Sequence, residues 1–97
     1  MLARVATFEG GDAEEIRGNV AEIQQRAQTG PPEGVPGRGF TMLVQPDQGR
    51  VLAIALFETP EDYETGDAKL NEMSPPSGAM GRRVSVERYE VGVDVRL

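Results

Sequence analysis

The sequence predicts an α+β domain in which four strands form one antiparallel sheet and two helices cover one of its faces. Three observations predict this fold class. The periodic segments follow the order strand, helix, strand, strand, helix, strand. Two runs rich in proline and glycine, at residues 29–39 and 74–82, interrupt that order as loops. The chain of 97 residues has the size of one domain, which we place at residues 1–97.

The first strand and the first helix lie in residues 2–28. Residues 2–10 mix β-branched, aromatic and small side chains and end at a pair of glycines, which is typical of a strand followed by a turn. Asp12 as N-cap and Glu15 as its capping-box partner predict the start of a helix over residues 12–28. The apolar stripe of that helix consists of Ile16, Val20, Ile23 and Ala27. Gly18 lies inside the helix, and we interpret it as tolerated there.

Residues 40–45 and 51–57 are apolar runs that form an antiparallel hairpin. The intervening PDQGR supplies Pro46, Asp47 and Gly49 for a tight turn. The second run, VLAIALF, is apolar at every position, which indicates a strand covered on both faces. Because the chain has enough helix for one layer only, the second cover has to come from elsewhere.

The second helix is predicted over residues 59–73. Thr59 is its N-cap, Pro60 is its first residue, and acidic side chains fill its first turn. Its inner stripe consists of Tyr63, Leu70 and Met73, with Gly66 between them. The complete element order is that of the ferredoxin-like βαββαβ fold.

The last segment, RRVSVERYEVGVDVRL, is predicted to be a strand up to its final residue. Its apolar side chains alternate and share one face: Tyr89, Val91, Val93, Val95 and Leu97. Val84 and Val86 have the opposite parity, so we expect a bulge near Glu87 and Arg88. An uncovered sheet face and an apolar strand end are an aggregation hazard for a single chain. We therefore predict a symmetric homodimer with the five alternating residues in its interface.

Composition excludes several classes of partner. The net charge of −6 repels a phosphate backbone, so no nucleic acid is expected. The chain begins without a basic leader and apolar run, and no segment has the length of a membrane span, which predicts a soluble cytoplasmic protein that contacts no membrane. Cysteine and histidine are absent, and we interpret the acidic residues from Glu58 to Glu72 as a solvated helix face. No metal and no cofactor are expected.

The element order, the chain length and two motifs, FETPEDYE at the junction of the third strand and second helix and the closing RRVSVERYEVGVDVRL, carry a family resemblance. The chain resembles the dimeric α+β barrel superfamily, especially its small antibiotic biosynthesis monooxygenase-like proteins, over nearly its whole length. The resemblance implies two sheets packed face to face as a barrel and a pocket between the sheet and helices of each subunit. Haem-degrading relatives use a histidine and a tryptophan, which this chain lacks, so that activity is not expected.

The pocket that the resemblance implies has polar and apolar candidate residues. The polar candidates are Arg4, Asn19 and Tyr63, because a tyrosine or arginine can hold a substrate enolate while oxygen adds. Each also has an ordinary interpretation: Arg4 as the cross-strand partner of a glutamate, Asn19 as an exposed helix residue, and Tyr63 as an edge of the core. The apolar candidates, for which core packing is the default, are Phe40, Met42, Phe57, Met73 and Met80.

Two function classes stay open. The first is a non-catalytic homodimeric module that binds a small apolar ligand between sheet and helices or accompanies a partner protein. The second is a cofactor-independent monooxygenase acting on an aromatic or polyketide-like molecule. A serine triad is unavailable without histidine, and the only general bases are carboxylates, tyrosines and Lys69. These absences favour the first class, and no residue is assigned a catalytic role.

Overall fold

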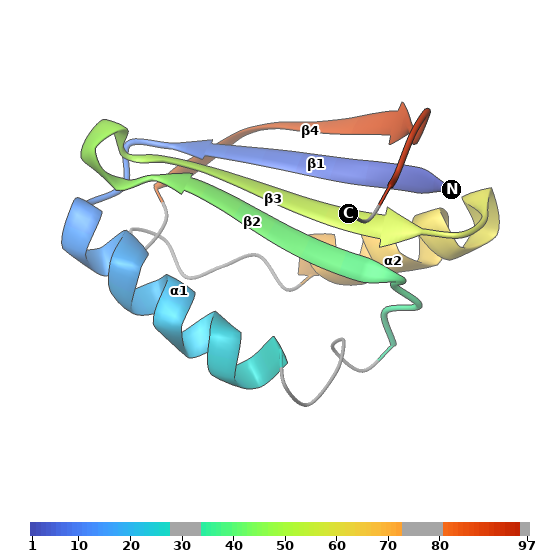
Figure 1. Ribbon diagram of the computed structural model, residues 1–97, viewed down its shortest axis with the longest axis horizontal. Coiled ribbons are helices and arrows are strands. Elements are labelled where there is room, and N and C mark those ends of the chain that lie inside the picture. Colours follow the sequence, from blue (N-terminus) through green and yellow to red (C-terminus); the bar gives the residue numbers. More distant parts are fainter. Residues whose placement is uncertain (28–33, 73–80, 96–97) are drawn as a thin grey trace.

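The computed structural model describes residues 1–27, 34–72 and 81–95, and these form four strands, two α-helices and one 3₁₀ turn (Figure 1). The elements are β1 (Leu2–Glu9), α1 (Ala13–Ala27), β2 (Gly39–Gln45), η1 (Pro46–Gln48), β3 (Arg50–Phe57), α2 (Pro60–Glu72) and β4 (Arg82–Glu90). The strands form one antiparallel sheet in the order β2-β3-β1-β4. The predicted α+β class and ferredoxin-like element order are confirmed.

Both helices cover the same face of the sheet; in Figure 1, α1 lies below the strands and α2 lies behind their right-hand end. Alternate residues of β1 and β3 point to that face and are buried there: Leu2, Arg4, Ala6 and Phe8, and Val51, Ala55 and Phe57. Two hydrophobic clusters fill the space beneath the helices. One joins Ile16 of α1 to Ala6, Phe8 and Val51, and the other joins Tyr63 of α2 to Leu2, Val35, Ala55 and Phe57. On β1, Arg4 lies between the residues that contribute to these clusters.

The predicted starts of both helices are confirmed by their capping hydrogen bonds. The backbone N–H groups of Glu14 and Glu15 donate to Asp12 Oδ2 at 3.2 and 3.3 Å. At the second helix, the N–H of Asp62 donates to Thr59 Oγ1 at 3.1 Å. In each case a side chain satisfies backbone donors that the first helical turn leaves without a partner.

The predicted turn between β2 and β3 is also confirmed. It is the 3₁₀ turn η1, after which Gly49 adopts a φ of 67° and donates its N–H to the Pro46 carbonyl at 3.0 Å. A Cβ atom at Gly49 would lie 2.6 Å from the carbonyl oxygen of Gly11. Both the left-handed backbone and this close approach require glycine.

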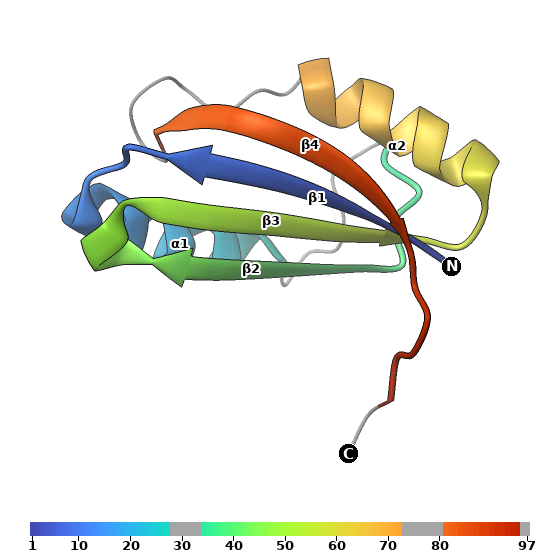
Figure 2. The same ribbon diagram turned by 90° about the horizontal axis from the view of Figure 1, so that it is seen from above.

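The prediction of a strand up to residue 97 is wrong in the single chain. The pairing of β4 with β1 ends at Glu90, which lies opposite Leu2, the first residue of β1. Val91 adds one hydrogen bond, from its N–H to the Met1 carbonyl at 3.0 Å. Residues 91–95 then leave the sheet on the side away from α2 and stand clear of it (Figure 2), with Val93 83% and Val95 67% exposed.

The predicted bulge position near Glu87 and Arg88 is also wrong. The register shift lies opposite Thr7 and Phe8, between Ser85 and Arg83 of β4. From Ser85 to Glu90 the strand alternates regularly, so that Val86 and Arg88 face the helices. The bulge therefore makes Val84 the extra residue and turns Arg83 toward the helices as well.

The two glycines inside the helices differ in what surrounds them. A Cβ atom at Gly66 of α2 would overlap the ring of Phe57, whereas a Cβ atom at Gly18 of α1 would meet no heavy atom within 4 Å. Gly18 is therefore tolerated, as interpreted from the sequence, and Gly66 allows α2 to approach the sheet closely.

This contrast predicts opposite effects of one substitution. Gly66→Ala is expected to lower the free energy of unfolding by about 1–3 kcal/mol, because the buried ring has little freedom to move. Gly18→Ala is expected to raise it by up to about 1 kcal/mol through helix propensity alone. Urea unfolding of both variants checks the pair. A gain in stability for Gly66→Ala would contradict the close packing of α2 on Phe57.

Candidate functional site

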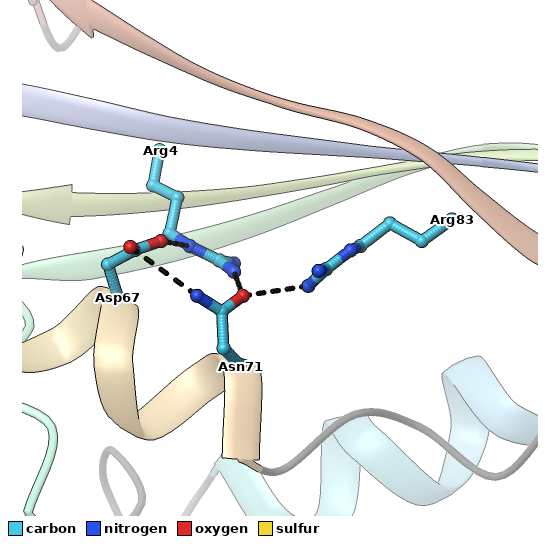
Figure 3. A network of polar contacts seen from close by, with 4 residues as sticks. All are labelled: Arg4, Asp67, Asn71 and Arg83. Atoms are coloured by element: carbon cyan, nitrogen blue, oxygen red, sulfur yellow. Dashed lines mark hydrogen bonds and ion pairs between the residues drawn. The ribbon is translucent and has the colours of Figure 1, made fainter.

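A network of polar side chains connects α2 to β1 and β4 (Figure 3). Arg4 of β1 donates from Nε to Asp67 Oδ1 at 2.6 Å and from Nη2 to Asn71 Oδ1 at 3.0 Å. Arg83 of β4 donates from Nη1 to the same Asn71 oxygen at 2.9 Å. The amide of Asn71 also lies 3.5 Å from Asp67 Oδ2. Two guanidinium groups from neighbouring strands thus meet at one side-chain oxygen of α2.

Local geometry explains why these residues meet. Tyr63, Asp67 and Asn71 are four residues apart on α2 and therefore lie on one stripe of the helix. Arg4 and Arg88 are directly opposite each other in the pairing of β1 with β4, and both face α2. Arg83 joins this face because of the bulge that precedes Ser85.

Tyr63 lies beside this network on the inner side of α2. Its ring makes an edge contact with Phe57, with ring centroids 5.5 Å apart and an interplanar angle of 71°, and the Cζ atom of Arg88 lies 4.8 Å from its centroid. Burial raises the pKa of the Tyr63 hydroxyl, and the charge of Asp67 raises it further, against the opposing effects of Arg4 and Arg88. Tyr63 therefore keeps its proton at neutral pH and is a hydrogen-bond donor.

Positive charge exceeds negative charge in this cluster. Arg4, Arg83 and Arg88 contribute three guanidinium groups. Among the described residues, Asp67 is the one carboxylate that pairs with any of them, and it pairs with Arg4. Arg4 is 5% exposed, whereas Arg83 and Arg88 are exposed at the edge of the cluster. The cluster can attract an anion, although the chain as a whole carries a net charge of −6.

The structure brings together three of the candidate pocket residues. Arg4, Phe57 and Tyr63 all lie between the sheet and α2, although Arg4 pairs with Asp67 of the helix and not with a glutamate of a neighbouring strand. Tyr63 is buried at 7% exposure, as a core residue would be.

The remaining candidates do not join this group. Met42 packs against the cluster beneath α1, Asn19 is a half-buried residue of α1, and Phe40 is 52% exposed on β2. Met73 and Met80 lie outside the described residues, as does Leu97 of the predicted interface. The other predicted interface residues include Tyr89, 49% exposed on the face without helices, and Val91, which is half-buried.

Sequence analysis missed Asp67, Asn71, Arg83 and Arg88. For Asp67 and Asn71 the sequence does contain a signal. Together with Tyr63 they are spaced four residues apart, which puts these polar side chains on the inner stripe of a helix. Arg83 had no usable signal, since the sheet face to which it points depends on where the bulge lies.

A shallow, open depression beside α2 is separate from the polar network. It is lined by Gly34, Val35, Pro36, Asp62 and Thr65.

Comparisons with protein-family models, curated proteins and solved structures found no match. In the described part of the chain, no three acidic side chains gather as a metal site requires, and neither helix has the length and apolar character to cross a membrane.

Proposed function

We propose that this protein is a homodimeric, non-catalytic module of the antibiotic biosynthesis monooxygenase-like kind. The observation that carries the proposal is the sheet face without helices. It presents apolar side chains from all four strands, among them Val5, Leu43, Leu52, Ile54, Leu56 and Tyr89. Of these, Leu43 is 50% exposed and Tyr89 49% exposed.

A second copy of the chain has the surface that fits this face. Packing two such faces removes apolar surface from water on both chains at once, which is the usual arrangement of a twofold dimer. The alternating valines of residues 91–95 support this partner, because Val93 and Val95 are exposed in the single chain and the segment that carries them stands clear of its own sheet. A neighbouring sheet offers the apolar surface that they lack.

The chemistry between sheet and α2 supports a non-catalytic module over a monooxygenase. An oxygenase without cofactor needs a group that removes a proton from its substrate. Here the Tyr63 hydroxyl holds its own proton, and Asp67 is engaged by Arg4 at 2.6 Å. Phe57 and Tyr63, at 0% and 7% exposure, fill the apolar part of this space with the protein's own side chains, which also disfavours an apolar ligand there.

The dimer is tested by charge introduced into the projecting segment. Val93→Asp and Val95→Asp are each expected to weaken self-association by at least about 100-fold, because a twofold interface contains each change twice. Sedimentation velocity at micromolar protein should show the wild type at twice the mass of one chain and both variants as single, less stable chains. Gln25→Asp on the exposed face of α1 adds the same charge elsewhere and should leave the dimer intact.

Two results would contradict the proposed dimer or its interface. A stable, fully folded single chain at micromolar wild-type concentration would remove the need for a partner. Dimers of unchanged strength in Val93→Asp and Val95→Asp would exclude this segment from the interface.

Native mass spectrometry after incubation with a cell extract tests whether the protein is non-catalytic. A retained aromatic molecule that is consumed together with oxygen would favour the monooxygenase.

A further inference from the structure

We propose that Arg4, Arg83 and Asn71 form a binding site for the oxyanion group of a small molecule, a carboxylate or a phosphate, between α2 and β4. This site lies on the helix-covered face of the sheet, whereas the proposed dimer uses the opposite face. The inference therefore goes beyond the proposed function and does not depend on it.

The arrangement of the two guanidinium groups carries the inference. Arg4 Nη2 and Arg83 Nη1 lie 3.0 and 2.9 Å from a single oxygen, Asn71 Oδ1, as Figure 3 shows. Two like charges held this close repel each other, and a neutral amide oxygen offsets that repulsion only in part. An anionic oxygen forms stronger hydrogen bonds to guanidinium than an amide oxygen does, so an oxyanion bound beside Asn71 would offset the repulsion that remains.

The charged groups around the site do not neutralise all of its guanidinium groups, so the compensating anion has to come from outside the protein. Asp67 accepts from Arg4 Nε, and no carboxylate of the described residues pairs with Arg83. Other arginines of the chain do have acidic partners: Arg17 pairs with Asp47, Arg38 with Glu58 and Arg50 with Glu9. In the described part of the chain, Arg83 and Arg88 on the helix-covered face of β4 form no such ion pair, and Arg82 on the opposite face forms none either.

The site combines one buried, fixed donor with one exposed donor. Arg4 is 5% exposed and fixed by Asp67, which leaves its guanidinium pre-organised at the edge of α2. Arg83 is exposed and uses Nη1 for Asn71, so its other N–H groups are available to a ligand. Arg88, on the same face of β4, adds to the positive potential along this edge.

The test is an NMR titration of the full chain with sodium benzoate and, separately, with inorganic phosphate at constant ionic strength. Saturable shifts of the Arg83 Nε–H and Asn71 side-chain amide signals are expected with at least one of the two anions. Arg83→Gln should weaken this binding at least about tenfold, because it removes a charge-assisted hydrogen bond. Arg82→Gln is the matched control, since it removes the same charge one residue away and on the opposite sheet face.

A second variant keeps the proposal testable by another route. Asn71→Asp puts a carboxylate against both guanidinium groups and neutralises them from within the chain, so the variant should stay folded and lose its response to both anions. Saturation with benzoate alone or phosphate alone supports the site and identifies the group that it prefers. The proposal is overturned if neither anion gives saturable shifts, or if Arg82→Gln weakens binding as much as Arg83→Gln does.

Discussion

Asp67→Ala is expected to lower the free energy of unfolding by about 3 kcal/mol. The substitution removes the carboxylate that lies 2.6 Å from Arg4 and leaves that guanidinium, 6% exposed in its side chain, without an ionic partner. A buried charge without its partner keeps its desolvation cost and loses the compensating attraction. The loss falls at the lower end for buried pairs because the Asp67 side chain is itself 33% exposed and already partly screened by water.

Chemical unfolding at one fixed protein concentration measures this loss, since stability depends on concentration in any protein that self-associates. Glu9→Ala is the control, because it breaks the exposed Arg50–Glu9 pair at 3.2 Å and should cost at most about 1 kcal/mol. The double variant Arg4→Met with Asp67→Leu replaces both charges by apolar side chains and should recover most of the loss. Equal costs for Asp67→Ala and Glu9→Ala would mean that Arg4 does not depend on its buried partner.

The fold was predictable from the sequence because its signals are local and agree with one another. Asp12 and Thr59 are N-caps whose side chains accept from backbone N–H groups two or three residues later, so each marks a helix start without reference to the rest of the chain. The turn at residues 46–50 is also marked locally, because its left-handed position favours a glycine and Gly49 supplies it. Consistency between such local signals is what specifies a fold.

Strand register and site composition were less predictable, because they depend on partners distant in sequence. The end of β4 is decided by where β1 begins, and alternation within residues 82–97 contains no information on that limit. The position of the bulge decides whether Arg83 or its neighbour faces α2. A buried Arg4 likewise cannot be distinguished from an exposed strand arginine until Asp67 and Asn71 are known to lie above it.

Phe57→Ala is expected to cost about 3–5 kcal/mol, a large fraction of the roughly 5–15 kcal/mol that stabilises a typical domain. Phe57 is the last residue of β3, is 0% exposed, and contacts both the Tyr63 ring and the backbone of α2 at Gly66. Removing its ring leaves a cavity at the point where Gly66 lets the helix approach the sheet closely, and α2 then loses much of its attachment. Phe40→Ala is the matched control, because Phe40 points to the same sheet face and is 52% exposed, so it should cost far less.

If Phe57→Ala does not fold, Phe57→Leu provides the measurement, with an expected cost of about 1–2 kcal/mol. The same variant tests why the residue of α2 that faces the Phe57 ring, Gly66, is a glycine. Gly66→Ala should be less destabilising in the Phe57→Leu protein than in the wild type, because the smaller side chain no longer occupies the space that the new methyl group needs. A double-mutant cycle measures this coupling from four unfolding curves. Strict additivity would show that Phe57 and Gly66 are not in contact, and the tight packing of α2 on β3 would then have to come from other residues.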